Sequence, residues 1–386
     1  MWTCWTTRCC SALALIALTS TPIVAQSATA PPSLFPLRPV WTLALNNQIT
    51  VPPAYRDNLG VFAIEHDRLV AYDLTTGLRK WLVAARPQTP LAIGDGLVFI
   101  SEPEALRAVR TTDGSTAWTL PLPEKLSVPP VWDNGWLVVV TEAGELIAFR
   151  AADGLLIWRA DLGSPAHARP ALAADRVYVP TGDGRIVAVK VDTGARLWDR
   201  QLGGPGNEIL ALDDRLYVGS QDNFFYCLLT ADGRVDWRWR TGADVIGQPV
   251  LSGNLVYFLS LDNVLRALHH TSGVQRWRAS VPLRPVAGPV TAFDVLIVTG
   301  VGASLPAFTL SDGRPAGEVP AAGEAAAPPY VFSSGQADFP IVVAVGRDIA
   351  SGATVTAMIR SGEPKPLPMA PLPNLIPPAA TTRPPQ

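Results

Sequence analysis

The 386-residue sequence has few charged side chains and few residues of the types that bind metals. Charged residues make up 17% of the chain, and 31 Lys and Arg are balanced by 33 Asp and Glu. Such a balance excludes the strong positive field of a nucleic-acid-binding protein. Only four His and four Cys are present, and no metal-ligand spacing, phosphate-binding loop or nucleophile elbow occurs. We therefore expect no catalytic residue, cofactor, metal or nucleic-acid partner.

The sequence also lacks a hydrophobic run long enough to cross a membrane as a helix. The apolar run from Ser11 to Leu18 is well short of the ~20 residues that a spanning helix needs. It follows Arg8 and precedes a stretch of small residues, as in a secretory signal peptide. We expect residues 1–27 to be a cleaved signal peptide, with a retained N-terminal anchor as the alternative, and the mature chain to be periplasmic or otherwise exported. Cleavage would leave Cys227 as the only thiol, so no internal disulfide is expected.

The rest of the chain contains a repeat of about 40 residues. In each copy a small residue is followed six positions later by Gly, and four positions after that by Trp. The copies are Ala71, Gly77 and Trp81; Ala108, Gly114 and Trp118; Ala148, Gly154 and Trp158; Ala188, Gly194 and Trp198; Cys227, Gly233 and Trp237; Ala267, Gly273 and Trp277; and Ala307 and Gly313, where Gly317 replaces Trp. Short β-branched runs bounded by Gly, Asn and Asp lie between these markers and predict strands, with no helical pattern.

Four antiparallel strands in about 40 residues is the period of a β-propeller blade. After the seventh copy, residues 341–345 and 355–359 predict two more strands, and Pro329 marks a short one before them. The missing fourth strand is expected at the other end of the chain, in residues 41–45, where Trp41 stands 40 positions before Trp81. We therefore predict an all-β, eight-bladed β-propeller over residues 40–362, in which the N-terminal strand closes the ring.

Both flanks of this domain are rich in proline. Residues 28–39 form a Pro-rich lead-in, and residues 363–386 contain nine prolines and almost no charge. Proline lacks an N–H donor and favours extended conformations, so neither strand nor helix is expected in the tail. We expect a flexible terminus, with a docking peptide as the alternative.

The recurring Trp is expected to pack between blades, because one fixed position in every blade indicates architecture better than a sugar or cofactor platform. The seam beside Gly317 should then be the least well packed. Trp132 and Trp136 lie off the repeat position and flank a turn, so they are candidate partner-binding aromatics, with partial burial between blades as the alternative. The pair His269 and His270 is expected to lie in a solvated turn rather than in a metal site.

The clearest copy reads Ala-x-Asp-x-x-Thr-Gly-x-x-x-Trp from Ala71 to Trp81 and resembles the tryptophan-docking repeat of quinoprotein-type, or PQQ-like, β-propellers. One branch contains alcohol and glucose dehydrogenases that use pyrroloquinoline quinone and calcium. The alcohol dehydrogenases place a vicinal disulfide over the quinone, but the only adjacent cysteines here, Cys9 and Cys10, lie in the expected signal peptide. The other branch contains BamB-type periplasmic scaffolds of the outer-membrane β-barrel assembly machinery, which are similar in size, blade count and export signal.

The resemblance implies a non-catalytic, monomeric scaffold whose partner is a protein, with components of outer-membrane β-barrel assembly as candidates. The assembly scaffolds carry an acidic pair before a blade-initial Pro. Here only Asp244 matches, five residues before Pro249, and Ile246 replaces the second carboxylate. Asp244 is thus a candidate partner-binding residue, with an ordinary loop carboxylate as the alternative. The alternative function is a quinone-dependent dehydrogenase-like enzyme, or a binder of small ligands in the central channel.

Overall fold

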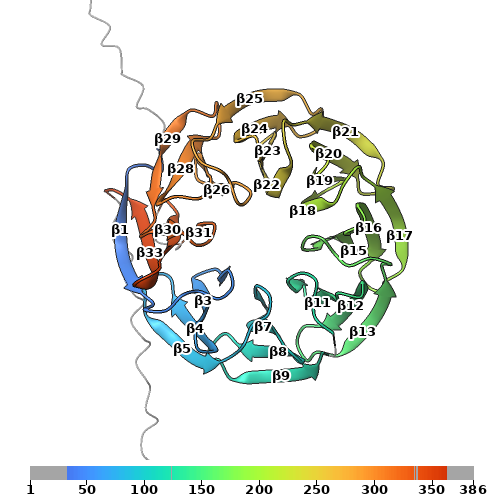
Figure 1. The fold of residues 1–386 in the computed structure, drawn as a ribbon, viewed down its shortest axis with the longest axis horizontal. Coiled ribbons are helices and arrows are strands. Elements are labelled where there is room, and N and C mark those ends of the chain that lie inside the picture. The colour runs from blue at the N-terminus through green and yellow to red at the C-terminus, as the bar shows by residue number, and fades with distance from the viewer. Residues whose placement is uncertain (1–32, 123, 334, 336–337, 363–386) are drawn as a thin grey trace, which may run out of the picture. The chain divides into compact units, whose positions relative to one another are not determined.

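Eight antiparallel β-sheets surround a central channel and form the blades of a propeller (Figure 1). The structure is a computed structural model that describes residues 33–122, 124–333, 335 and 338–362. Every regular element in these residues is a strand. The predicted eight-bladed propeller is therefore confirmed. The described part of the chain contains no helix long and apolar enough to cross a membrane.

The blades follow one another along the chain, and strands are numbered from the inside of each blade outward. Blades 1 and 2 contain β2 (Ala54–Arg56), β3 (Leu59–Ile64), β4 (Arg68–Asp73), β5 (Arg79–Ala84), β6 (Ala92–Gly94), β7 (Leu97–Glu102), β8 (Ala105–Arg110) and β9 (Thr116–Pro121). Blades 3 and 4 contain β10 (Val131–Asp133), β11 (Trp136–Val140), β12 (Glu145–Arg150), β13 (Leu156–Asp161), β14 (Ala171–Ala173), β15 (Arg176–Pro180), β16 (Arg185–Lys190) and β17 (Arg196–Gln201).

Blades 5 and 6 contain β18 (Gly206–Leu212), β19 (Arg215–Ser220), β20 (Phe224–Leu229), β21 (Val235–Arg240), β22 (Val245–Ser252), β23 (Leu255–Ser260), β24 (Val264–His269) and β25 (Gln275–Ser280). Blade 7 contains β26 (Val290–Ala292), β27 (Val295–Ile297), β28 (Ser304–Thr309) and β29 (Pro315–Pro320). Blade 8 contains β31 (Tyr330–Phe332), β32 (Ile341–Asp348), β33 (Gly352–Arg360) and β1 (Leu37–Ala44), with the short β30 (Glu324–Ala325) beside β32.

The hydrophobic core lies between blades rather than within them. The two middle strands of each blade are almost wholly buried, as in β3, whereas the outermost strand alternates between exposed and covered residues, as in β5. One representative cluster joins Val138 and Val140 of blade 3 to Val177 and Val179 of blade 4. Because each blade buries its faces against its neighbours, no blade has a complete core of its own.

Each repeated Trp lies on the outermost strand of one blade and contacts the turn of the next. Trp158 packs against Gly194 and donates its indole N–H to the carbonyl of Val191 at 2.7 Å. Gly194 has a φ of +70°, which favours glycine, and a Cβ atom there would lie 2.5 Å from the indole. Equivalent bonds run from Trp41, Trp81, Trp118, Trp198, Trp237 and Trp277 to the carbonyls of Leu74, Thr111, Ala151, Thr230, His270 and Leu310.

The seam beside Gly317, which lacks the docking Trp, is filled by another aromatic side chain. A Cβ atom on Gly317 would lie 2.7 Å from the ring of Phe35, which comes from the segment just before β1. Leu34 and Val319 are fully buried in the same cluster. The N-terminal segment thus occupies space that the missing indole leaves, and whether this seam is the least well packed stays a prediction.

The N-terminal strand completes blade 8, as predicted. β1 pairs antiparallel with β33, from Leu37 opposite Arg360 to Ala44 opposite Thr354. β1 begins within the segment expected to be a lead-in. The expected signal peptide in residues 1–27 and the Pro-rich tail in residues 363–386 lie outside the described residues.

Candidate functional site

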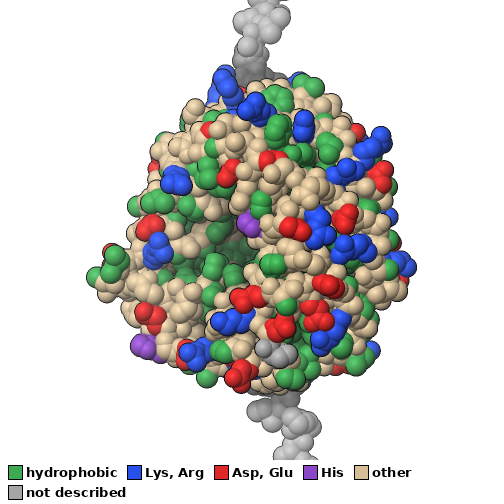
Figure 2. Space-filling model, turned by 45° about the vertical axis from the view of Figure 1, so that its right-hand side comes forward, with side chains coloured by type: hydrophobic (Ala, Val, Ile, Leu, Met, Phe, Trp, Pro, Cys, Tyr) green, Lys and Arg blue, Asp and Glu red, His purple; other side chains and the backbone are tan. Residues whose placement is uncertain are grey.

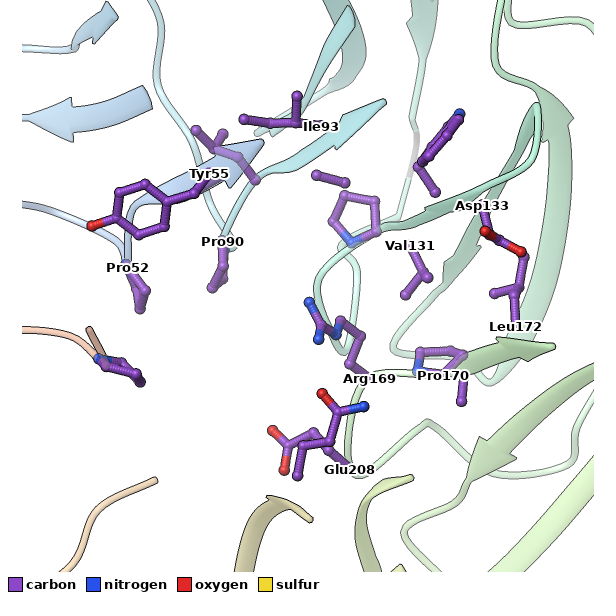
Figure 3. A pocket seen from close by; sticks show the side chains of 18 of the residues that line it. Pro52, Tyr55, Pro90, Ile93, Val131, Asp133, Arg169, Pro170, Leu172 and Glu208 are labelled. Carbon is purple, nitrogen blue, oxygen red and sulfur yellow. The ribbon is translucent and has the colours of Figure 1, made fainter. Parts of the chain in front are cut away.

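The inner strands form a cavity at the central channel. It has a volume of about 650 Å³ and is lined by residues of blades 1 to 6 and of blade 8 (Figure 3). Figure 2 shows its opening as a hollow with a largely hydrophobic interior, surrounded by side chains of both charges. Blades 6 and 7 approach each other closely beside it, since a Cβ atom on Gly247 would lie 2.0 Å from the backbone nitrogen of Gly288.

One position of the repeat contributes a residue to the channel lining in most blades. It is two residues before the three-residue inner strand of blade 4 and the residue before the Pro that starts most blades, and the structural register places Leu91 and Ile209 in the position of this Pro in blades 2 and 5. In chain order the residues at this position are Pro52, Pro90, Pro129, Arg169, Glu208, Gln248, Gly288 and Pro328. Three consecutive blades thus carry polar side chains there, and we call Arg169, Glu208 and Gln248 the polar arc.

The two charged members of the polar arc have no partner in the described part of the chain. Figure 3 shows the side chains of Arg169 and Glu208 directed into the cavity. Neither side chain makes a hydrogen bond or an ion pair with any other described residue, so the two charges lie more than 4.0 Å apart. Gln248 is held in place, because its amide Nε2 donates to the carbonyl of Ile209 at 3.0 Å. Gln248 lines the cavity, and its Oε1 can accept a further hydrogen bond.

An aromatic pair occupies the opposite wall, where blades 8 and 1 face blades 4 and 5 across the ring (Figure 1). The rings of Tyr55 and Tyr330 are stacked at 4.6 Å with an interplanar angle of 8°. The Tyr330 hydroxyl donates to the carbonyl of Asp57 at 3.2 Å. The Tyr55 hydroxyl is buried without a hydrogen-bond partner, and burial raises its pKa. The channel therefore has one polar side and one apolar side.

The two candidate aromatics outside the repeat position are both partly buried between blades. The ring of Trp132 packs on Gly94, its Nε1 donates to Asp95 at 3.2 Å, and the guanidinium of Arg56 lies 4.8 Å from the ring centroid. Trp132 also lines the channel. Trp136 packs against the cluster between blades 3 and 4. Their positions match the alternative of partial burial, and a role in partner binding stays a prediction.

Asp244 is not brought together with these aromatics. It immediately precedes β22, and its carbonyl accepts a hydrogen bond from the N–H of Leu261 at 2.9 Å. The strand register makes Trp132 the counterpart of Leu251, which lies near the C-terminal end of β22. Because the inner strands run in the same direction, Asp244 and Trp132 lie toward opposite faces of the ring. No hydrogen bond or ion pair of the Asp244 side chain occurs among the described residues.

The backbone of His270, at the turn after β24, takes part in the docking of a Trp. The carbonyl of His270 accepts hydrogen bonds from Trp237 Nε1 and from the Tyr217 hydroxyl, each at 3.1 Å. His270 and His269 are half-buried, and burial lowers the pKa of His270. His270 lies in the turn that follows β24, as expected, but the two side chains are half-buried rather than fully solvated. In the described part of the chain, no group of three or more His, Cys, Asp or Glu is arranged to hold a metal ion.

A second cavity lies on the outer surface between blades 2 and 3, and we call it the β13 groove. It has a volume of about 510 Å³, and its apolar walls are formed by Leu120, Leu122, Ile147, Phe149, Leu155 and Leu156. Leu155, Leu156 and Ile157 are 51%, 43% and 39% exposed and form the longest consecutive run of exposed large apolar residues in the described chain. A surface run of this kind is a candidate interaction site. Sequence reasoning missed it, although polar residues such as Arg79 and Lys80 occupy the two corresponding positions of blade 1.

Comparison with known proteins supports the fold and one family. A family model described as outer membrane protein assembly factor BamB matches residues 38–124, 102–212 and 204–328, which together span more than half of the chain. No curated protein sequence matches the chain significantly.

Several solved structures share the architecture. BamB from Moraxella catarrhalis aligns with a TM-score of 0.68 and 19% identity, covering 85% of this chain and 99% of that one. The quinohemoprotein alcohol dehydrogenase from Comamonas testosteroni aligns with a TM-score of 0.69 and 14% identity, covering 87% of this chain and 78% of that one. The computationally designed Ika8 protein aligns with a TM-score of 0.66 and 12% identity, covering 81% of this chain and 97% of that one. At such identities these likenesses show the fold alone.

Proposed function

Because the chain belongs to the family of outer membrane protein assembly factor BamB, we propose that it is a non-catalytic scaffold that binds a polypeptide partner. The proposed partner is a component of outer-membrane β-barrel assembly, and the proposed location is the periplasm, reached with residues 1–27 as a signal peptide. In this proposal residues 28–39 are the lead-in, residues 40–362 the binding domain and residues 363–386 a flexible tail. The scaffold acts as a monomer.

The observation that carries this proposal is the β13 groove. β13 is the outermost strand of its sheet, so one of its edges has unpaired backbone N–H and C=O groups. An extended segment of a partner can add to such an edge through main-chain hydrogen bonds. The exposed side chains of Leu156 and Ile157 point to opposite faces of the strand, and the groove offers an apolar pocket beside them. Blade 3 thus combines a free edge, apolar contacts and a cavity.

The test is the recovery of a partner with the tagged full-length chain from envelope extracts of its source organism. We expect a β-barrel assembly component to be recovered, and we expect the double variant Leu156→Glu, Ile157→Glu to lose it. Both side chains are exposed, so the variant should keep its fold, which circular dichroism and thermal unfolding can check. Leu82→Glu is a matched control, because Leu82 is a similarly exposed residue on the outermost strand β5 of blade 1. The proposal would be overturned if no β-barrel assembly component were recovered, or if the wild type, the double variant and Leu82→Glu recovered it equally.

A quinone-dependent dehydrogenase is the second candidate, since the fold is shared with a quinohemoprotein alcohol dehydrogenase. The described residues do not fit the required groups. Calcium needs six to eight oxygen ligands, whereas no suitable cluster of acidic side chains occurs in the described chain. Arg169 is the only cationic side chain of the channel lining. Dye reduction after addition of pyrroloquinoline quinone and Ca²⁺, together with thermal stabilisation, would favour the enzyme over the scaffold.

A further inference from the structure

The polar arc presents two opposite charges that do not neutralise each other. Arg169 and Glu208 come from equivalent positions of consecutive blades and both face the channel. Flexible side chains of opposite charge usually pair when they are neighbours, yet these two have no ion pair among the described residues. The space between a cation and an anion is complementary to a molecule that carries both charges.

The chemistry of the arc defines what such a molecule contains. A guanidinium binds a carboxylate through two parallel N–H donors. A carboxylate such as that of Glu208 accepts hydrogen bonds from an ammonium group. The free Oε1 of Gln248 accepts a further N–H, because Nε2 of the same amide is already bonded to Ile209. The three side chains together offer one site for a carboxylate and two acceptors for N–H groups.

The opposite wall selects for an apolar body between the charged ends. Pro52 and Pro328 occupy the same repeat position on that side, and Tyr55 and Tyr330 lie stacked behind them. The cavity of about 650 Å³ is within the ~300–1,000 Å³ usual for small-molecule sites. This volume exceeds the needs of a single amino acid and accommodates a short peptide.

We propose that the channel binds a small zwitterion at the polar arc, with its carboxylate on Arg169 and its ammonium group on Glu208. The ligand class is a short peptide with free termini and apolar side chains, which lie against the proline and tyrosine wall. This site is separate from the β13 groove, and the proposal rests on the channel alone and not on the proposed scaffold function.

The test is isothermal titration calorimetry of the full chain with the tripeptide Ala-Leu-Ala. We expect saturable binding, and we expect the same tripeptide with an acetylated N-terminus and an amidated C-terminus not to bind. Arg169→Gln and Glu208→Gln should each weaken binding about tenfold or more, because each removes a hydrogen bond to a charged group. Arg276→Gln is the matched control, since Arg276 is an exposed arginine on β25, far from the channel lining.

Titrations with other small molecules distinguish between ligands that carry the same charged groups. Free alanine and leucine that bind as tightly as the tripeptide would assign the site to amino acids, whereas tighter binding of the tripeptide would assign it to peptides. Acetate that binds as tightly as the tripeptide would show an anion site at Arg169 alone and overturn the proposal. Absence of binding up to millimolar concentration, or equal binding by the wild type and both arc variants, would also overturn it.

Discussion

Phe35 shows how a single side chain compensates for a break in the repeat. Six of the seven internal blades place a Trp on the outermost strand, and the seventh has Gly317. The Phe35 ring lies directly on this glycine, and Leu34 beside it is completely buried. The aromatic contact between these two blades is thus kept, although it comes from the opposite end of the chain.

Phe35→Ala is therefore expected to lower the free energy of unfolding by about 2–3 kcal/mol. This loss is at or below the lower end of the range for Phe→Ala substitutions in protein cores, because Phe35 is only half-buried. Urea unfolding followed by tryptophan fluorescence would measure the loss. Phe293→Ala is the control, since Phe293 is 46% exposed and its removal should cost much less. Equal effects of the two substitutions would show that Phe35 does not seal this seam.

Tyr55 carries a buried polar group without a partner. Its hydroxyl makes no hydrogen bond, and a buried unsatisfied hydroxyl costs about 1–3 kcal/mol. Tyr55→Phe should keep the stack on Tyr330 and raise the free energy of unfolding by about 1 kcal/mol. Tyr330→Phe, which removes the hydrogen bond to Asp57, should not stabilise the protein. A loss of stability in Tyr55→Phe would contradict this account.

At the scale of an element, the hairpin between β23 and β24 links stability to pH. Burial alone would raise the pKa of Asp262, but hydrogen bonds from Arg266 and Ser260 and the charge of Arg266 outweigh it and lower the pKa to about 2. The Arg266–Asp262 ion pair is close, at 2.6 Å, and its side chains are 8% and 19% exposed.

A carboxyl group with a lowered pKa in the folded state stabilises the fold above its unfolded pKa, near 4, and loses this contribution as pH falls toward 2. Asp262 contributes about 2 kcal/mol to the free energy of unfolding above pH 4. We expect the free energy of unfolding to fall between pH 4 and pH 2, and Asp262→Asn to flatten this dependence. Asp232→Asn is a control on an exposed turn. If both variants follow the wild-type pH profile, the ion pair does not contribute.

Sequence reasoning predicted the elements that the repeat specifies. The predicted strands at residues 341–345 and 355–359 are parts of β32 (Ile341–Asp348) and β33 (Gly352–Arg360), and Trp41 was correctly placed on the closing strand. The repeat also predicted the docking of the indoles, because Trp recurs at the same position in seven blades. The polar arc was readable in part from the same register, because Arg169 and Gln248 precede a blade-initial Pro, whereas Glu208 precedes Ile209.

Other contacts left no periodic signal. Phe35 lies outside the repeat and contacts Gly317 only because the ring closes, so its role depends on a distance in space that no local pattern encodes. The β13 groove depends on the shapes of six side chains from two blades. The unpaired hydroxyl of Tyr55 likewise follows from packing against blade 8. These contacts could be identified only in the folded ring.

At the scale of the whole molecule, neighbouring blades share their hydrophobic cores. A reagent can therefore reach a side chain buried between two blades only where the ring opens. Cys227 is fully buried on β20, in the cluster between blades 5 and 6. Burial raises the pKa of its thiol to about 12, so the reactive thiolate is scarce at neutral pH.

We expect iodoacetamide at pH 8 to leave Cys227 unmodified in the native protein and to modify it fully in 6 M guanidinium chloride. Mass spectrometry of the tryptic peptide covering residues 216–234 would follow this cysteine alone, since the other cysteines precede residue 11. Trp237→Ala should speed the native reaction, because Trp237 lies opposite Cys227 on the neighbouring strand β21. Rapid modification of the native wild type would contradict the buried, closed arrangement.

The pairing of β1 with β33 also has a consequence for the order in which the chain is made. β1 leaves the ribosome before any other described strand, and its only strand partner, β33, leaves last. The first blade edge to be synthesised must therefore stay unpaired until translation is almost complete. A nonsense codon anywhere before Gly352 would remove this partner, so loss of the C-terminal strand would leave the N-terminal strand unpaired.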